Sequence, residues 1–281
     1  MKFSILVFHV KPEFTVTIIF NLKDQNMPWN PDVYNKFKDI RYKPFYDLIE
    51  FIQPQNGMKA IDLGCGTGEQ TSILADKFKD AHFLGVDSSA EMLEKSKALE
   101  TNKLHFRKAT TEEIINSGEK WDLIFSNAAL QWSNDHESLF SNLLKLLTKD
   151  GQFAVQMPVQ PENKLNKILS DLVDEEPFKS YLKGYKRDSP VLSLDKYAQM
   201  LFDGGLKDIE ILQKVYPIIA DDHETLYNFI SGSALIPYIE RLEGEQKELF
   251  IKTYKERIAV NFPKLPAIYS FKRILMFGRK E

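Results

Sequence analysis

The chain has 281 residues, of which 43% are hydrophobic, so it can bury the core of one large domain. Its formal net charge is only −3, which excludes the basic excess that nucleic-acid-binding proteins carry. The single cysteine, Cys65, excludes an intrachain disulfide, and the five histidines show no metal-ligand spacing. We therefore expect a cytoplasmic protein that binds no metal ion and has neither nucleic acid nor a membrane as partner.

Residues 1–26 form an apolar, β-branched leader that is interrupted at Lys11-Pro12-Glu13. The leader lacks the unbroken apolar centre of a signal peptide, and it is too short and too interrupted to cross a bilayer. We interpret residues 1–26 as an uncertain extension and residues 27–281 as a single domain that begins near Met27. The alternative is a hairpin of residues 3–10 and 14–20 that adds to a sheet edge or a partner.

Aromatic side chains are frequent between Trp29 and Ile52. Residues 44–52 have helical spacing, and Pro44 suits the first turn of a helix. Most of these aromatics are expected to pack in the core. Trp29 and Tyr34 are the candidates to reach a ligand, as parts of a flap that folds over a cofactor.

The stretch 58–68 is the centre around which the chain is organised. An apolar run ends at Asp62-Leu63, and Gly64, Gly66 and Gly68 follow at every second position, with Cys65 as a small residue inside the turn. A helix is expected to begin at Glu69. A strand, a glycine turn and a helix in this order hold a nucleotide-like cofactor against the backbone.

The spacing of the turn narrows the choice of cofactor. A dinucleotide-binding turn would have its third glycine at position 69, which is Glu69, and no Gly-Lys-Ser/Thr sequence of a phosphate-binding loop is present. Asp62 and Glu69 would also repel a pyrophosphate. A cationic adenosyl ligand without phosphate, such as S-adenosylmethionine, suits these acids. A nicotinamide-dependent oxidoreductase remains the alternative, and the missing glycine argues against it.

The next two strands supply further candidate cofactor contacts. A strand over residues 81–86 ends at Asp87, where a carboxylate can accept two hydrogen bonds from a ribose diol. Ser88-Ser89 is expected to cap a helix that has Met92 in its first turn. A third strand, residues 104–108, leads to Thr110 and Thr111, which either bond the adenine edge or cap the following helix.

A fourth strand over residues 121–127 is followed by candidate catalytic residues. Its end, Asn127, and the following Gln131 and Trp132 should face the same crevice, because ligands bind beyond the carboxyl ends of parallel strands. His136 is the one candidate base, with a helix-capping loop residue as the alternative. A helix over residues 139–147 and a fifth strand over residues 152–158 complete a parallel β-α-β pattern.

The pattern then changes to helices. Residues 160–190 and 221–265 are expected to form helical cap insertions, separated by a helix over 193–202 and a strand over 209–219. A last strand covers residues 267–277, and the charges of Lys272 and Arg273 are expected to face solvent. Possible polar residues of an acceptor pocket are Gln156, Tyr185, Arg187, Tyr238 and Tyr269.

Three segments together resemble the class I S-adenosylmethionine-dependent methyltransferases: residues 61–68, 85–89 and 121–127. More narrowly, the chain from Trp29 to its end is similar to the trans-aconitate 2-methyltransferase group. That narrower resemblance depends on the segments Trp29-Asn30-Pro31 with Tyr34, Leu130-Gln131-Trp132 with Asp135-His136 and Leu139-Phe140, residues 154–158, residues 232–237 and the terminal strand.

The resemblance implies an α/β fold: a doubly wound, Rossmann-like, seven-stranded and mostly parallel sheet with one antiparallel strand in a terminal hairpin. It also implies roles for individual residues. The glycines would let the backbone approach the methionine part of the cofactor, Asp62 would support its amino group and Asp87 would hold the ribose. The remaining roles would be Met92 near the adenine, Asn127 near the methionine moiety, and Gln131 and Trp132 facing the methyl group and acceptor.

Two departures from the family pattern concern Thr110 and Ile236. Thr110 stands where the class often has an acid that meets the adenine amino group. Ile236 stands where the trans-aconitate enzymes carry an arginine that is expected to meet a substrate carboxylate. The second departure favours an acceptor with less charge than a polycarboxylate.

The sequence thus predicts a methyltransferase that O-methylates a small carboxylic acid and leaves S-adenosylhomocysteine as product. A carboxylate is already ionised at neutral pH, so no general base is required. The alternatives are an acid bound to acyl carrier protein, another small metabolite methylated at N or C, and a non-catalytic cofactor-binding protein. The expected assembly is a monomer or weak dimer.

Overall fold

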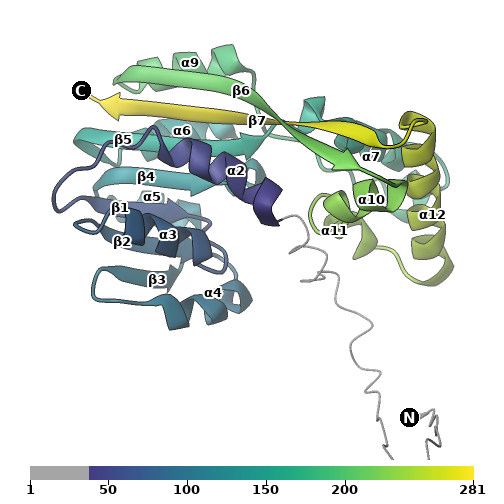
Figure 1. The fold of residues 1–281 in the computed structure, drawn as a ribbon, viewed down its shortest axis with the longest axis horizontal. Coiled ribbons are helices and arrows are strands. Elements are labelled where there is room, and N and C mark those ends of the chain that lie inside the picture. The colour runs from purple at the N-terminus through teal and green to yellow at the C-terminus, as the bar shows by residue number, and fades with distance from the viewer. Residues whose placement is uncertain (1–37) are drawn as a thin grey trace, which may run out of the picture.

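The computed structural model describes residues 38–281, in which seven strands form one sheet in the order β3-β2-β1-β4-β5-β7-β6 (Figure 1). β7 runs antiparallel to both neighbours, and the other adjacent pairs are parallel. The predicted mostly parallel sheet with a terminal hairpin is therefore confirmed. The strands are β1 Lys59–Leu63, β2 His82–Asp87, β3 Leu104–Lys108, β4 Trp121–Asn127, β5 Leu147–Pro158, β6 Leu206–Ala220 and β7 Ala267–Lys280.

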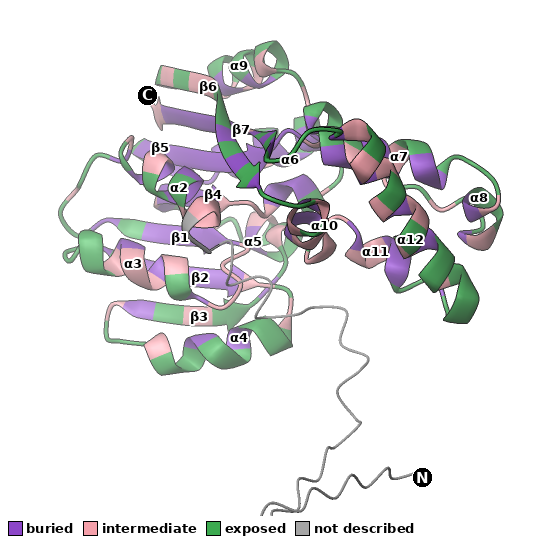
Figure 2. Cartoon of the chain, turned by 45° about the vertical axis from the view of Figure 1, so that its right-hand side comes forward, coloured by how far each residue is buried: buried purple, intermediate pink, exposed green. Residues whose placement is uncertain are grey.

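Helices cover both faces of the sheet because successive strand residues point to opposite sides. Ile124 packs with residues of three helices on one face, and the next residue, Phe125, packs with two helices on the other. Figure 2 shows the burial concentrated on the strands and on the helix sides that face them. The first set is α5 Thr111–Ser117, α6 His136–Leu144 and α9 Leu194–Asp203, and the second set is α2 Lys38–Ile49 and α3 Glu69–Lys77.

A second body of helices lies beyond one end of the sheet, where the terminal hairpin reaches it (Figure 1). The β5–β7 pairing ends at Pro158 and Arg273, whereas the β6–β7 pairing continues to Ala220 and Ala267. Apolar side chains of this projecting hairpin form one core cluster with the helices, which we call the cap. The cap helices are α7 Lys164–Val173, α8 Phe178–Tyr181, α10 His223–Ser231, α11 Ile236–Ile239 and α12 Gly244–Asn261.

Several predicted boundaries differ from the observed ones. The helix predicted over residues 44–52 is α2, which spans Lys38–Ile49, so Pro44 lies inside it. The helix predicted from 139 begins at His136, because the Asp135 side chain caps its start by accepting a hydrogen bond from the Ser138 N–H at 3.2 Å. The fifth strand begins five residues earlier than predicted, at Leu147.

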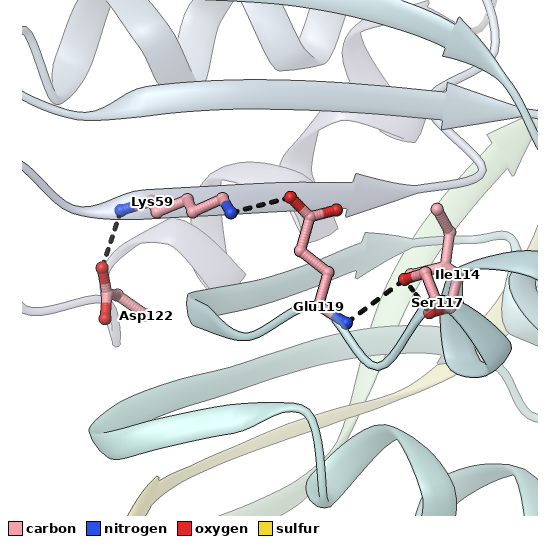
Figure 3. A network of polar contacts seen from close by, with 5 residues as sticks. All are labelled: Lys59, Ile114, Ser117, Glu119 and Asp122. Atoms are coloured by element: carbon pink, nitrogen blue, oxygen red, sulfur yellow. Dashed lines mark hydrogen bonds and ion pairs between the residues drawn. The ribbon is translucent and has the colours of Figure 1, made fainter.

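The end of the sheet opposite the glycine turn is held by a polar network (Figure 3). The backbone N–H of Lys59 donates to Oδ2 of Asp122 at 2.9 Å, and its Nζ contacts Oε1 of Glu119 at 2.7 Å. The Glu119 N–H in turn donates to Oγ of Ser117 at 3.3 Å, and that hydroxyl donates to the Ile114 carbonyl at 2.7 Å. The network joins β1 to the segment between α5 and β4, away from the carboxyl ends of the strands.

Candidate active site

A cavity of about 710 Å³ lies at the carboxyl ends of β1, β2 and β4, between the sheet and the cap. The sheet side is formed by the glycine turn and the strand ends, and the cap side by residues 187 and 232–237. The described residues that line it are Arg41, Tyr42, Gly64, Cys65, Gly66, Thr67, Glu69, Gln70, Asp87, Ser89, Met92, Lys95, Asn127, Ala128, Ala129, Trp132, Arg187, Gly232, Ser233, Ile236, Pro237 and Arg273.

The glycine turn is packed against neighbouring side chains so closely that two of its positions have no room for a Cβ. Gly64, Gly66 and Gly68 have φ values of 75°, 57° and 78°, in the left-handed region that favours glycine. A Cβ at Gly64 would lie 2.2 Å from the Cβ of Ala129, and one at Gly68 would lie 2.6 Å from the Phe106 ring. A Cβ at Gly66 would meet nothing within 4 Å, so this glycine leaves open space on the cavity wall.

Asp87 connects the end of β2 to the glycine turn. Its Oδ2 accepts a hydrogen bond from the Gly66 N–H at 2.9 Å, and its Oδ1 accepts one from the Ser89 N–H at 2.8 Å. Each carboxylate oxygen has a second lone pair, so Asp87 retains the capacity to accept hydrogen bonds from a diol. Ser89 caps α4 (Ala90–Ser96), and Ser88, the predicted contact, does not line the cavity, whereas Met92 does.

Asp62 lies behind the turn and not on the cavity wall. Its side chain is 3% exposed, and Oδ2 accepts a hydrogen bond from the Thr71 hydroxyl at 2.6 Å. Burial raises the pKa of Asp62 to about 7, against the opposing effect of the Thr71 hydrogen bond. Burial likewise raises the pKa of the Cys65 thiol, with the charges of Asp62 and Asp87 adding to the shift, so Cys65 is not an activated nucleophile.

Asn127 offers a hydrogen-bond acceptor to a ligand. Its Nδ2 donates to Oε1 of Gln70 at 2.9 Å, while its buried Oδ1 has no hydrogen-bond partner among the described residues. An unpartnered buried oxygen on a cavity wall suits an ammonium group. Together with the open space at Gly66 and the carboxylate of Asp87, it fits S-adenosylmethionine, which carries an amino group and a ribose diol.

Besides Asp62 and Ser88, four further predicted contacts do not line the cavity. Thr110 and Glu113 form a reciprocal capping box at the start of α5, and Thr111 is the first residue of that helix. Neither threonine lines the cavity, so the capping alternative fits their contacts. Gln131 is 4% exposed and donates to the Ala128 carbonyl at 2.6 Å, and Gly68 packs behind the turn. Trp29 and Tyr34 lie outside the described residues.

His136 is part of the core and not of the cavity wall. It is 2% exposed, with Nδ1 2.6 Å from the Tyr197 hydroxyl and Nε2 3.0 Å from the Leu130 carbonyl. Burial lowers its pKa, although the Leu130 and Ser133 backbone contacts oppose the shift. With both ring nitrogens engaged, His136 has none to take a proton from an acceptor, and we do not retain it as a base.

Trp132 does line the cavity, beside an arginine from a distant segment. Its side chain is 40% exposed, and the guanidinium carbon of Arg187 lies 4.2 Å from the centre of its ring. The Arg187 Nη2 also donates to the Trp132 carbonyl at 3.2 Å. Arg187 was among the possible pocket residues, whereas Gln156, Tyr185, Tyr238 and Tyr269 do not line this cavity.

Arg273 is the residue that the sequence prediction misplaced. It is only 7% exposed and lines the cavity, and its Nη1 donates to Oε1 of Gln156 at 2.7 Å. The signal was present in the alternation of β7, since Arg273 shares a face with the apolar Phe271 and Leu275. Tyr42 and Lys95 also line the cavity and were not predicted.

Other features of the described residues concern metals and membranes. Within residues 38–281 no group of three or more His, Cys, Asp or Glu side chains is placed to hold a metal ion. None of the helices in this part of the chain is long and apolar enough to cross a membrane.

Comparison with known proteins agrees with this geometry. A family model described as a methyltransferase domain matches residues 54–216. The trans-aconitate 2-methyltransferase of Deinococcus radiodurans is 39% identical over 260 residues, which cover 90% of this chain and 99% of that protein. The corresponding enzyme of Rhizobium etli is 30% identical and covers 90% of this chain and 100% of its own length.

A solved structure shares the fold at much lower sequence identity. A putative sarcosine dimethylglycine methyltransferase from Galdieria sulphuraria superimposes with a TM-score of 0.55 at 16% identity, covering 90% of this chain and 91% of that one. The sheet order, the glycine turn and the matches in sequence all agree. The chain therefore belongs to the methyltransferase-domain family and is a class I S-adenosylmethionine-dependent methyltransferase.

Proposed function

We propose that this enzyme transfers a methyl group to a carboxylate oxygen of a small organic acid, which gives a methyl ester and S-adenosylhomocysteine. The observation that carries the proposal is the set of cations on the cavity wall. Arg41, Lys95, Arg187 and Arg273 all line the same cavity as the glycine turn. The relatives named trans-aconitate 2-methyltransferase support an acid as acceptor.

The two signs of charge on the cavity wall suit two ligands. Asp87 and Glu69 belong to the cofactor-binding elements and suit a cationic cofactor. Arg187 comes from the cap and Arg273 from the terminal hairpin, and they suit an anion. Ile236 also lines the cavity, so the arginine that is absent at 236 is replaced by arginines from other elements.

The chain's residues bind and orient the reactants and supply no base. When bound, S-adenosylmethionine supplies a methyl group on a positively charged sulfur. Asp87 and Asn127 hold the cofactor, and the arginines hold the acceptor carboxylate, which is ionised near neutral pH. Trp132 covers the reaction site on the cap side. Alignment of two bound reactants lowers a barrier by about 7–11 kcal/mol, which is enough to make positioning the main catalytic effect.

Transfer of a labelled methyl group to paired compounds tests the proposal. We expect trans-aconitate and smaller carboxylic acids to be methylated, and the matching primary amides to stay unlabelled, because an amide lacks the anionic oxygen. Binding of S-adenosylhomocysteine and of NAD, measured by calorimetry, controls for an intact cofactor site. Labelling of amides, or of no acid by enzyme that binds S-adenosylhomocysteine, would contradict the proposal.

We further propose that the enzyme acts in the reducing cytosol as a monomer or weak dimer, on free small molecules. The unpaired thiol of Cys65 supports a reducing compartment, and the net charge of −3 supports an acceptor other than nucleic acid. Cell fractionation and light scattering across a concentration series test these points. Tight association, or retention with membranes, would contradict them.

A further inference from the structure

A second cavity, of about 380 Å³, lies on the other side of Trp132 and Arg187. Only these two of the described residues line both cavities. The segment 232–238 presents Ser233 and Ile236 to the main cavity and Ala234 and Tyr238 to the second. The two spaces are therefore adjacent, and the Trp132–Arg187 pair forms their boundary.

Arg187 is anchored through its backbone, and the Trp132 ring beside it is partly exposed. The Arg187 N–H donates to the Tyr238 hydroxyl at 3.1 Å, which fixes the backbone of residue 187. The Trp132 side chain is 40% exposed, so the core does not enclose its ring. The Arg187 guanidinium covers one face of that ring. The pair thus lies on the cavity walls, and neither residue belongs to a core cluster.

Arg187 also has an unused donor at the boundary. Its Nε is buried and has no hydrogen-bond partner among the described residues. Burial lowers the pKa of the guanidinium, which is the effect of lost hydration on a cation. A buried N–H without a partner is costly, so a ligand oxygen placed at the boundary would be bound favourably.

The chemistry of the second cavity differs from that of the main one. Its charges nearly balance, because Lys167, Lys186 and Arg187 are accompanied by Asp171 and Asp188. Lys186 is in addition paired with Asp174, outside the cavity lining. The other lining residues are hydrogen-bonding or apolar: Gln160, Pro161, Asn166, Leu169, Ser170, Ser189, Ala234 and Tyr238. Such a wall suits an uncharged chain with amide or hydroxyl groups better than a second carboxylate.

We propose that the acceptor occupies both cavities: its reacting carboxylate lies in the main cavity, and an uncharged, hydrogen-bonding tail passes Arg187 into the second. The inference rests on the proposed function for the reacting end, and it adds that the acceptor is an elongated acid with a polar, neutral far end. Arg187 contacts both parts and determines specificity.

A series of acids of increasing length tests the inference. We would measure kcat/KM for the monoamides of succinic, adipic and suberic acid, in the wild-type enzyme and in Ser170→Phe. Ser170 is half-buried and lines only the second cavity, so a phenyl ring there fills the tail site and leaves the main cavity open. Ser180→Phe, at an exposed site on α8 that lines neither cavity, is the matched control.

We expect kcat/KM in the wild type to rise about tenfold or more from the short to the long monoamide, which corresponds to about 1.4 kcal/mol. Ser170→Phe should abolish this gain while leaving the values for the succinic monoamide and the affinity for S-adenosylhomocysteine unchanged. Equal rates for all lengths in the wild type, or an equal loss for all lengths in Ser170→Phe, would overturn the inference.

A binding measurement separates this inference from the proposed function. Calorimetric titration of the suberic acid monoamide into the complex with S-adenosylhomocysteine requires no turnover. If no acid is methylated, the proposed function fails, yet tighter binding of the long monoamide that Ser170→Phe removes would still support an elongated ligand. Absence of any length-dependent binding would reject it.

Discussion

The guanidinium of Arg273 donates a hydrogen bond to the side-chain oxygen of Gln156 at 2.7 Å, within the β5–β7 pair. Both residues are buried, and Arg273 lies on the cavity wall. Glutamine is neutral, so this contact orients the guanidinium and adds no negative charge beside it. A polar residue at position 156 thus prepares a cation for an anionic acceptor.

Replacing this neutral partner by an acid should weaken acceptor binding. We expect Gln156→Glu, which is nearly isosteric, to lower kcat/KM for acid acceptors about 10- to 100-fold. The new carboxylate would form an ion pair with Arg273 and so weaken the attraction of Arg273 for the acceptor carboxylate. The affinity for S-adenosylhomocysteine, measured by calorimetry, should change little. Gln246→Glu, exposed in the first turn of α12, is the control for an added charge. An unchanged KM for acids would remove Arg273 from the acceptor site.

Asp87 should determine cofactor affinity. Asp87→Ala removes the acceptor of the Gly66 and Ser89 N–H groups and the proposed acceptor of the ribose hydroxyls. We expect the binding free energy of S-adenosylhomocysteine to weaken by about 1–3 kcal/mol. Glu91→Ala, exposed in the first turn of α4, should bind normally. A folded Asp87→Ala enzyme with unchanged affinity would refute the ribose assignment.

Two glycines of the same turn should respond differently to alanine. Gly64→Ala places a Cβ 2.2 Å from that of Ala129, so the free energy of unfolding should fall by more than the left-handed strain alone, which is about 1–2 kcal/mol. Gly66→Ala meets open space and should show only that strain, together with weaker cofactor binding. Urea denaturation and calorimetry separate the two effects. A larger stability loss in Gly66→Ala than in Gly64→Ala would contradict this account.

Asp62 should make stability depend on pH. Its pKa is raised to about 7 in the folded state, so between about pH 4 and 7 the folded chain holds a proton that the unfolded chain has lost. The free energy of unfolding should therefore fall as pH rises through this window, by up to about 4 kcal/mol from this group. The contribution is fully present below pH 4. In urea denaturation at several pH values, Asp62→Asn should lack this part of the slope, and parallel profiles would show the assignment to be wrong.

His136 should matter for stability and not for proton transfer. Tyr197→Phe removes the hydroxyl that contacts His136 Nδ1 and accepts from the Leu192 N–H at 3.1 Å. We expect a loss of about 1–3 kcal/mol in unfolding free energy, since buried polar groups lose their partner. The pH profile of methyl transfer per folded enzyme should stay unchanged. A shifted profile, absent in the control Tyr181→Phe, would restore a catalytic role for His136.

The sequence predicted most of the fold because the signals are local. Glycines at positions 64, 66 and 68 are required by the backbone angles of one turn, and the strands over 104–108 and 121–127 follow from short runs with the right alternation or burial. Thr110 shows a local signal that was left unused. A threonine before a helix fits both a ligand contact and a cap, and Glu113 three residues later is the sequence pattern of the capping box that the structure contains.

The sequence by itself determined the cofactor. The glycine turn follows β1 and Asp87 ends the next strand, β2, and a β-α-β unit fixes the distance along the chain between these two positions. The tertiary structure alone decided the acceptor side. Arg41, Arg187 and Arg273 belong to a helix, a cap loop and the last strand, and they converge only because the terminal hairpin holds the cap beyond the carboxyl end of the sheet. Long-range packing leaves no fixed spacing in the chain, so these residues carried no motif that a sequence pattern could detect.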